Sequence, residues 1–230
     1  MKFQRKLSIR TIAIFGAAAA LTLAAPAAFA STSQVTVNAN ASAFYGATTG
    51  SPGVNFTAGS APMDCASATA SGSLVLGSSS NGLGAGSITS STWTGCTALG
   101  GSVNMAVTQS GTWTLNAGDT NSSTGITPVT VTGVNAHVVD TTYGGAVCDF
   151  VVSGSVDGYL QESDQTLHIT LPTGVAMAPA TSPAALTLST VTKTCAGSIA
   201  QGQSATFLGI YQVGALAAPH ASLNIDITQP

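Results

Sequence analysis

The chain contains very little charge, and almost none of it is positive. Of its 230 residues, five are Lys or Arg and eight are Asp or Glu, whereas about 25% of the residues in an ordinary soluble domain are charged. Four of the five basic residues lie within the first ten positions, which leaves Lys193 alone in the rest of the chain. Nucleic acids and anionic lipids are bound by several Lys or Arg side chains, so the sequence predicts neither kind of partner.

Long apolar runs are also scarce, and the one that exists is short and N-terminal. A basic cluster at residues 2–10 precedes an apolar stretch over residues 11–25 and the small residues of Ala28-Phe29-Ala30. This order is typical of a secretory signal peptide with its cleavage site, and the stretch is too short to span a membrane. We therefore expect a signal helix over residues 1–30, no integral membrane anchor, and a secreted protein, free or associated with the cell surface. Its mature chain would carry one basic and eight acidic residues, a formal charge of −7.

Sequence motifs for catalysis are missing as well. There is no G-x-S-x-G nucleophile motif, no H-E-x-x-H zinc motif and no glycine-rich phosphate loop. His137 and His168 each stand between apolar residues, as outward-facing residues of a half-buried strand do, and His220 follows Pro219 in an expected loop. The sequence therefore predicts a non-catalytic protein without a cofactor.

What the sequence does have is alternation. After residue 31, apolar residues alternate with Thr, Asn or Ser, and clusters of Gly, Ser, Asn and Asp separate the alternating segments. This pattern predicts many short antiparallel strands. We expect one all-β domain over residues 31–230, built as a β-sandwich or as jelly-roll-like antiparallel sheets, with loops at residues 77–86 and 174–185. The expected strands include residues 34–39, 103–105, 113–115, 129–132, 167–171, 186–188 and 223–227.

An internal duplication surrounds the cysteines. A Ser-Gly-Ser segment follows Cys65 at residues 71–73, and a second one follows Cys148 at residues 153–155. In each half, a Ser-Thr-rich segment then leads to the next cysteine. These matches predict two internally similar halves. The halves extend over about residues 60–125 and 143–213.

The four cysteines predict disulfide bonds. An even number of cysteines in an exported chain is typical of a disulfide framework, and four cysteines allow three pairings. The duplication favours Cys65–Cys96 and Cys148–Cys195, with one bond in each half. A zinc site is the alternative interpretation, but the spacings are long and no C-x-x-C motif is present.

Four further segments, set between the cysteines, give the chain a distinctive layout. They are Gly86–Thr89, Gly111–Leu115, Val131–Val138 and Val152–Gly158. With them, the chain resembles small secreted proteins of actinobacteria over residues 65–213, and more distantly it resembles the secreted alkane-oxidation-activator family. This resemblance implies a cell-surface or biofilm-matrix role, and it supplies no catalytic residues.

The acidic residues offer two weak candidate sites. On a strand, Glu162 and Asp164 would share one face, and Asp157 precedes them across Gly158. Paired carboxylates of this kind serve a glycosidase or hold calcium, but a solvated hairpin has the same pattern. Asp119 begins a segment with oxygen ligands at alternate positions, which makes it a further calcium candidate, although the acidic density of a calcium loop is missing.

The two tryptophans, Trp93 and Trp113, each lie in a Thr-flanked segment. Exposed, they would form a platform for a ligand such as a sugar ring; buried, they would anchor the core. Three functions stay open at this point. The first is a structural surface or matrix component that self-associates through its uncharged strands. The second is a binding module for a carbohydrate or a hydrophobic small molecule, and the third is a hydrolase that uses the acidic residues.

Overall fold

The protein is all-β. The computed structural model describes residues 34–79, 81–169, 185–216 and 221–229, so the expected signal peptide and His220 lie outside the described residues. Within these ranges the chain forms strands and turns without a helix. A search of the same ranges for a helix long and apolar enough to cross a membrane finds none. The strands form one sheet of eleven strands and one of three.

Five long strands extend over the full height of the large sheet. Each has an inward-facing set of apolar residues, as in β9, where Val134, Ala136 and Val138 are buried and the residues between them are partly or fully exposed. This is the alternation that the sequence predicted for half-buried strands. The long strands are β4 (Ala61–Leu74), β6 (Gly86–Ala98), β9 (Ile126–Asp140), β10 (Cys148–Gln161) and β13 (Ser204–Ala215).

Six short strands complete the large sheet in three pairs. The two members of a pair follow one another along the same neighbouring long strands, with a break between them, so that each pair fills one position of the sheet. The pairs are β2 (Ala43–Thr48) with β3 (Val54–Ala58), β7 (Val103–Gln109) with β8 (Trp113–Ala117), and β11 (Thr166–Ile169) with β12 (Leu186–Thr194).

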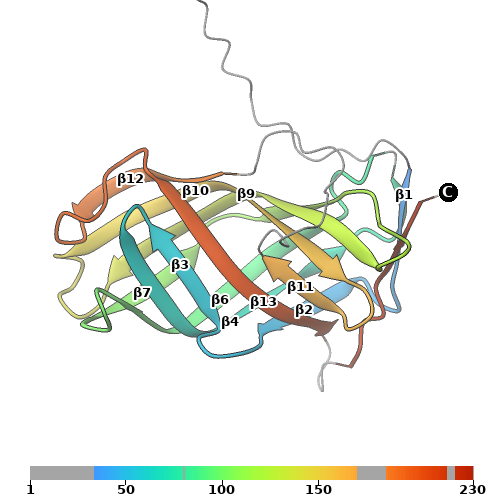
Figure 1. The fold of residues 1–230 in the computed structure, drawn as a ribbon, viewed down its shortest axis with the longest axis horizontal. Coiled ribbons are helices and arrows are strands. Elements are labelled where there is room, and N and C mark those ends of the chain that lie inside the picture. Colours follow the sequence, from blue (N-terminus) through green and yellow to red (C-terminus); the bar gives the residue numbers. More distant parts are fainter. Residues whose placement is uncertain (1–33, 80, 170–184, 217–220, 230) are drawn as a thin grey trace, which may run out of the picture.

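The large sheet closes on itself into an eight-stranded barrel (Figure 1). At either end the ring consists of the five long strands and one member of each short pair. Closure depends on β9 pairing with β10 along almost its entire length, and on β13 pairing with β2 and β3 near the start of the chain. The expectation of a sandwich or jelly roll is therefore wrong. Alternation marks which side chains face inward, and it does so equally in a sandwich and in a barrel.

The three-stranded sheet covers one end of the barrel, beside the C-terminus in Figure 1. It consists of β14 (Asp226–Thr228), β1 (Val35–Asn38) and β5 (Gly77–Ser79), in that order. Its apolar side chains, among them Val35 and Ile227, are buried. The loop expected at residues 77–86 thus contains a short strand, β5, whereas the loop expected at 174–185 lies outside the described residues except for Ala185.

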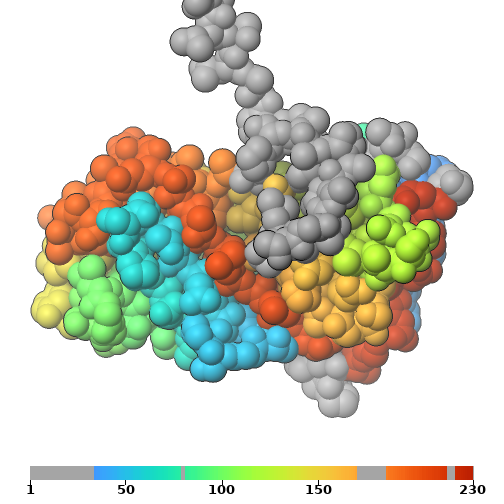
Figure 2. All heavy atoms as spheres, in the orientation of Figure 1, coloured from blue at the N-terminus to red at the C-terminus, as the bar shows by residue number. Residues whose placement is uncertain are grey.

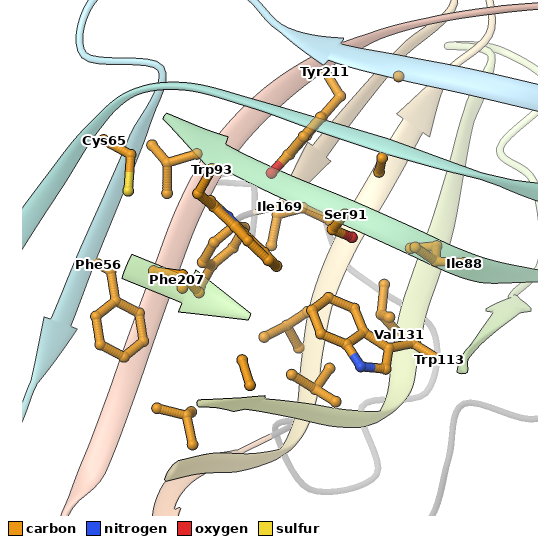
Figure 3. Close-up of a pocket in the computed structure, with 18 of the residues that line it drawn as sticks. Phe56, Cys65, Ile88, Ser91, Trp93, Trp113, Val131, Ile169, Phe207 and Tyr211 are labelled. Carbon is orange, nitrogen blue, oxygen red and sulfur yellow. The ribbon is translucent and has the colours of Figure 1, made fainter. Parts of the chain in front are cut away.

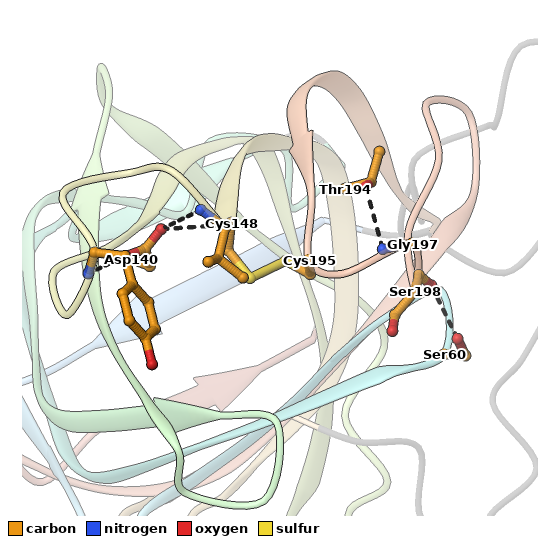
Figure 4. The surroundings of a disulfide bond; sticks show 9 residues. Ser60, Asp140, Cys148, Thr194, Cys195, Gly197 and Ser198 are labelled. Carbon is orange, nitrogen blue, oxygen red and sulfur yellow. Dashed lines mark hydrogen bonds between the residues drawn. A yellow bond between two sulfur atoms is a disulfide. The ribbon is translucent and has the colours of Figure 1, made fainter.

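Both predicted disulfides are confirmed, Cys65–Cys96 and Cys148–Cys195. Each joins two adjacent antiparallel strands, β4 with β6 and β10 with the end of β12, and both lie at the end of the barrel opposite the small sheet. Figure 4 shows the Cys148–Cys195 bond and its surroundings. The two Ser-Gly-Ser segments also occupy similar places. Gly72 and Gly154 each lie at a shift in the strand register, where a Cβ atom would overlap the backbone of a neighbouring segment.

Candidate functional site: the barrel cavity

The interior of the barrel contains an apolar cavity of about 80 Å³ (Figure 3). An eight-stranded barrel has an interior just wide enough for side chains to fill or for one small ligand to occupy. Here the filling is incomplete, and the reason lies in an unequal distribution of side-chain size. Six aromatic rings line the cavity from β2, β3, β6, β8 and β13, and they belong to Phe44, Phe56, Trp93, Trp113, Phe207 and Tyr211.

The wall opposite these rings is made of small side chains. The residues that β9 and β10 contribute to the cavity are all Val or Ala. Valine is favoured on a strand because its branched side chain suits the pleated surface, but it does not reach the barrel axis as an aromatic ring does. The cavity therefore follows from two neighbouring long strands of small residues: Val131, Val134, Ala136, Val138, Val152 and Val156.

The two tryptophans meet inside the barrel. Their ring centroids lie 6.1 Å apart with an interplanar angle of 43°, within the range of favourable aromatic pairs. Trp113 is 8% exposed, whereas Trp93 is only partly buried. Of the two alternatives for these residues, an exposed platform and a buried core anchor, the exposed platform is not the observed arrangement. Trp113 is a core residue that also borders the cavity, and Trp93 borders both the cavity and the surface.

Two hydroxyl groups are present in this apolar lining. The hydroxyl of Tyr211 points into the cavity, and Ser91 lies beside it on β6 (Figure 3). Burial raises the pKa of Tyr211 well above its usual value of 10.0, because the charged phenolate is poorly solvated in an apolar interior. The Tyr211 hydroxyl therefore stays protonated at any physiological pH, and it is available both as a donor and as an acceptor.

Two further polar atoms near the cavity lack partners. Among the described residues, Nε1 of Trp113 and Oε1 of Gln109 are buried without a hydrogen bond. The amide nitrogen of Gln109 is engaged, because it donates to the carbonyl oxygens of Ile88 at 3.1 Å and Gly111 at 2.9 Å. A buried polar atom without a partner costs on the order of 1–3 kcal/mol. Both atoms belong to residues that flank the break between β7 and β8.

A second apolar cavity of about 60 Å³ lies toward the small sheet. Phe44, Leu167 and Val213 line both cavities, so these three side chains form the partition between them. The far wall includes Val37 of β1 and Ile227 of β14. The apolar space thus extends from the middle of the barrel to the sheet that covers its end.

The predicted carboxylate candidates lie outside the cavity. Glu162 and Asp164 belong to the turn between β10 and β11, so the strand geometry that would put them on one face does not apply. They line a surface groove to which Asp157 does not contribute. Asp157 accepts a hydrogen bond from the Thr130 hydroxyl at 2.9 Å. Within the described ranges, no three His, Cys, Asp or Glu side chains lie close enough together to hold a metal ion. This holds for Asp119 as well as for the three residues above.

The two histidines in the described ranges are engaged by neighbours on their own sheet. Nε2 of His137 lies 2.8 Å from Asp149, and the imidazole is about half exposed. His168 stacks on Tyr159 with ring centroids 4.4 Å apart. Burial lowers the pKa of His168, so its neutral form predominates at neutral pH. Neither residue lines the cavity.

Comparison of the chain with protein-family models, curated proteins and solved structures finds no match. The resemblance to secreted actinobacterial proteins therefore stays a prediction. Four of the six aromatic residues of the cavity were not singled out from the sequence. Their signal is weak, because Phe44, Phe56, Phe207 and Tyr211 are ordinary inward positions of alternating strands until the ring is closed.

Proposed function

We propose that this protein binds a small apolar molecule inside its barrel. The observation that carries the proposal is the aromatic-lined cavity at the centre of a closed eight-stranded sheet. Small-molecule sites are mostly apolar concavities with a few polar groups that fix orientation. The hydroxyls of Tyr211 and Ser91 fit the second part of that description. The binding module for a hydrophobic small molecule is thus the function that the geometry supports best.

The dimensions of the cavity favour a slender ligand. An apolar cavity of about 150 Å³ is large enough to take up benzene or xenon, and the central cavity here measures about 80 Å³. A linear chain fits such a space better than a ring system does. Movement of the Phe44 or Leu167 side chain would add the second cavity of about 60 Å³. Burial of a six-carbon chain contributes about 5 kcal/mol of binding free energy. We therefore expect dissociation constants of about 0.1–1 mM.

Bromohexane provides a direct test, because bromine quenches tryptophan emission on contact. The only two tryptophans, Trp93 and Trp113, both line the cavity. We expect the fluorescence of the purified protein to fall saturably with bromohexane, and hexane to compete for the same site. Linear quenching without saturation, unaffected by hexane, would contradict the proposal.

A matched pair of variants separates cavity binding from surface binding. Ala136→Leu adds three carbons to a buried side chain that lines the cavity, whereas Ala106→Leu adds them to an outward-facing residue of the neighbouring strand β7. We expect saturable quenching to be lost in the first variant and kept in the second. Equal binding by both variants would place the ligand elsewhere.

The proposal includes secretion. Two disulfides are typical of proteins that fold in an oxidising compartment. The basic and apolar segments of residues 1–30 match a signal peptide. The test is to express the full chain in a secreting host and to sequence the N-terminus of the protein in the medium. We expect it to begin at Ser31.

A structural role at the cell surface or in a matrix is the second candidate. Leu208 and Ile210, on the outer side of β13, are 45% and 38% exposed, and exposed apolar side chains favour association. Closure of the barrel weakens the edge-to-edge route, because each of its long strands is hydrogen-bonded to neighbours on both sides over at least part of its length. Sedimentation of the purified protein tests this candidate. Assembly that disappears in Leu208→Gln with Ile210→Gln would support it, and a monomer at every concentration would reject it.

A further inference from the structure

The barrel wall is interrupted between β2 and β3, and this break is sealed. The amide of Thr49 donates to the Ile210 carbonyl at 2.9 Å, and the amide of Gly53 donates to the Cys65 carbonyl at 3.0 Å. The Thr48 hydroxyl accepts the amide proton of Ala68 at 2.9 Å. On this face of the molecule, residues 43–58 pack directly against β13 (Figure 2). The backbone on either side of this break is therefore tied to both neighbouring strands.

The break between β7 and β8 is open. β6 pairs with β7 only at residues 96–98 and with β8 only at residues 86–88, so residues 89–95 of β6 have no ladder partner on this side. Across from them, residues 106–109 of β7 pair only with β9. A groove of about 470 Å³ occupies the space between these two segments.

This groove leads to the cavity. Ser91, Trp93 and Val107 line the groove on the outside and the cavity on the inside. All three are partly exposed, and Val107 stands on the inward-facing side of β7 with the buried residue Met105. The same side chains therefore border solvent and the apolar interior, as the lining of an entrance does.

The side chain of Gln109 spans the groove. It starts from β7, and its amide nitrogen donates to the Ile88 carbonyl of β6 at 3.1 Å. Its oxygen is one of the two buried polar atoms without a partner, and the other, Nε1 of Trp113, belongs to the first residue of β8. One atom is an acceptor and the other is a donor, and both flank the same break.

We propose that this groove is the entrance to the cavity and that it holds the uncharged, hydroxyl-bearing head group of a single-chain amphiphile. The inference rests on the proposed function, because the apolar chain of the same ligand occupies the cavity. A hydroxyl both donates and accepts, so it can pair with an acceptor such as Oε1 of Gln109 and with a donor such as Nε1 of Trp113. A bare hydrocarbon would leave both atoms unpaired.

The groove is unsuited to a charged head group. Its polar lining consists of Ser, Thr and Gln side chains. His137, on the adjoining strand β9, is paired with Asp149 of β10. Lys193 is the single Lys or Arg within the described ranges, and it lies on β12, outside the groove. Because an ion loses hydration on binding and would gain no counter-charge here, a carboxylate or an ammonium group is disfavoured.

Four hexyl compounds test the head-group assignment on the full mature protein: hexanol, hexane, hexanoate and hexylammonium. In competition with bromohexane, we expect hexanol to bind about tenfold more tightly than hexane, since two hydrogen bonds are gained. Hexanoate and hexylammonium should bind no better than hexane. Equal affinities for hexanol and hexane would overturn the inference and leave the proposed function intact, whereas binding of none of the four would overturn the proposed function itself.

Substitutions at the groove test the route. Val107→Phe narrows the opening where groove and cavity meet, and we expect the association rate of bromohexane to fall about tenfold, because access through the groove is then the slow step. Thr49→Phe adds the same ring at the sealed break and should leave the rate unchanged. Equal rates in both variants would refute the route.

Gln109→Leu keeps the inference testable if Val107→Phe does not fold. This variant removes the unpaired acceptor and the bond across the groove, with little change in side-chain volume. We expect hexanol to lose its advantage over hexane, while the affinity for hexane stays the same. An unchanged preference for hexanol would show that Gln109 takes no part in recognising the head group.

Discussion

The two ends of the barrel are stabilised in different ways. At the disulfide end, Cys65–Cys96 and Cys148–Cys195 each tie neighbouring strands together covalently. The carboxylate of Asp140, at the end of β9, accepts hydrogen bonds from three backbone amides, those of Tyr143, Val147 and Cys148, at 2.7–3.0 Å (Figure 4). Strand ends and the loop between β9 and β10 are thus fixed by covalent bonds and by one buried anion.

The opposite end relies on side chains that hold the small sheet in place. Gln165 accepts the amide proton of Ile225 at 2.6 Å and donates to its carbonyl at 2.9 Å. Glu162 accepts from the Ile227 amide and from the Thr127 hydroxyl, both at 3.0 Å. These contacts join the C-terminal segment to the barrel without a covalent bond. Local opening should therefore begin at the small sheet, because segments held by few contacts open first.

Loss of a disulfide should destabilise the protein more than any change at the small-sheet end. In Cys65→Ala with Cys96→Ala, we expect the free energy of unfolding to fall by about 3–4 kcal/mol, because the unfolded chain regains the freedom of a loop of tens of residues. Urea unfolding followed by tryptophan fluorescence measures it. If this variant loses less free energy of unfolding than Gln165→Ala does, the ranking of the two ends is reversed.

Removal of the Gln165 side chain should be the most destabilising single change at the small-sheet end. Gln165→Ala leaves the amide and the carbonyl of Ile225 without their partner, which costs about 2 kcal/mol. Gln161→Ala is the matched control, because the Gln161 amide group bonds to exposed parts of a turn and its loss should cost under about 0.5 kcal/mol. Hydrogen exchange should accelerate at β1 and β14 in the first variant, while the disulfide end keeps its protection. Uniform acceleration would mean that the two ends open together.

The inward alternation of the strands was predictable from the sequence, but closure of the sheet was not. Residues 129–132 and 167–169 form strands as expected, because their apolar residues alternate with threonine or histidine. β4 was missed over most of its length, since Ala66-Ser67-Ala68-Thr69-Ala70 offers little contrast between its two faces. Periodicity also gives no information on partners, so neither the pairing of β9 with β10 nor the return of β13 to β2 could be deduced.

The candidate site was predictable in part. Trp93 and Trp113 stood out as the only tryptophans, and they do line the cavity. Their position depends on the closed ring, and the groove beside them depends on β6 changing partners from β8 to β7 along its length. Such a change leaves no periodic signal in the sequence. The cysteine pairs, in contrast, followed from local similarity between two segments, which a single sequence does contain.

Acidic pH should affect the stability of the two ends of the barrel differently. Hydrogen bonds from the amide of Cys148 and its neighbours hold the pKa of Asp140 below its ordinary value of 3.8. A lowered pKa contributes stability above that value, and this contribution is lost as the pH falls through the pKa of the folded protein. Asp140→Asn should therefore be less stable than the parent at neutral pH. As the pH falls through the most acidic range, its stability should not show the decline that the parent shows. Unfolding midpoints measured from pH 2 to pH 7 test this. Parallel curves for the two proteins would exclude an ionised Asp140 as the source of stability.

Glu162 should change the stability with pH in the direction opposite to Asp140, and by the smallest amount. Burial raises the pKa of Glu162 above its ordinary value of 4.5, and the nearby charge of Asp226 adds to the rise. A raised carboxyl pKa favours the protonated form in the folded state, so its contribution is most favourable below pH 4.5 and declines as the pH rises through the folded value. Glu162→Gln keeps an amide oxygen for the Thr127 and Ile227 contacts and carries no charge. At neutral pH, we expect it to be as stable as the parent or more stable by about 0.5 kcal/mol or less. The decline of stability between pH 4.5 and neutrality should be weaker in this variant, and a steeper decline would mean that the ionised carboxylate holds the small sheet in place.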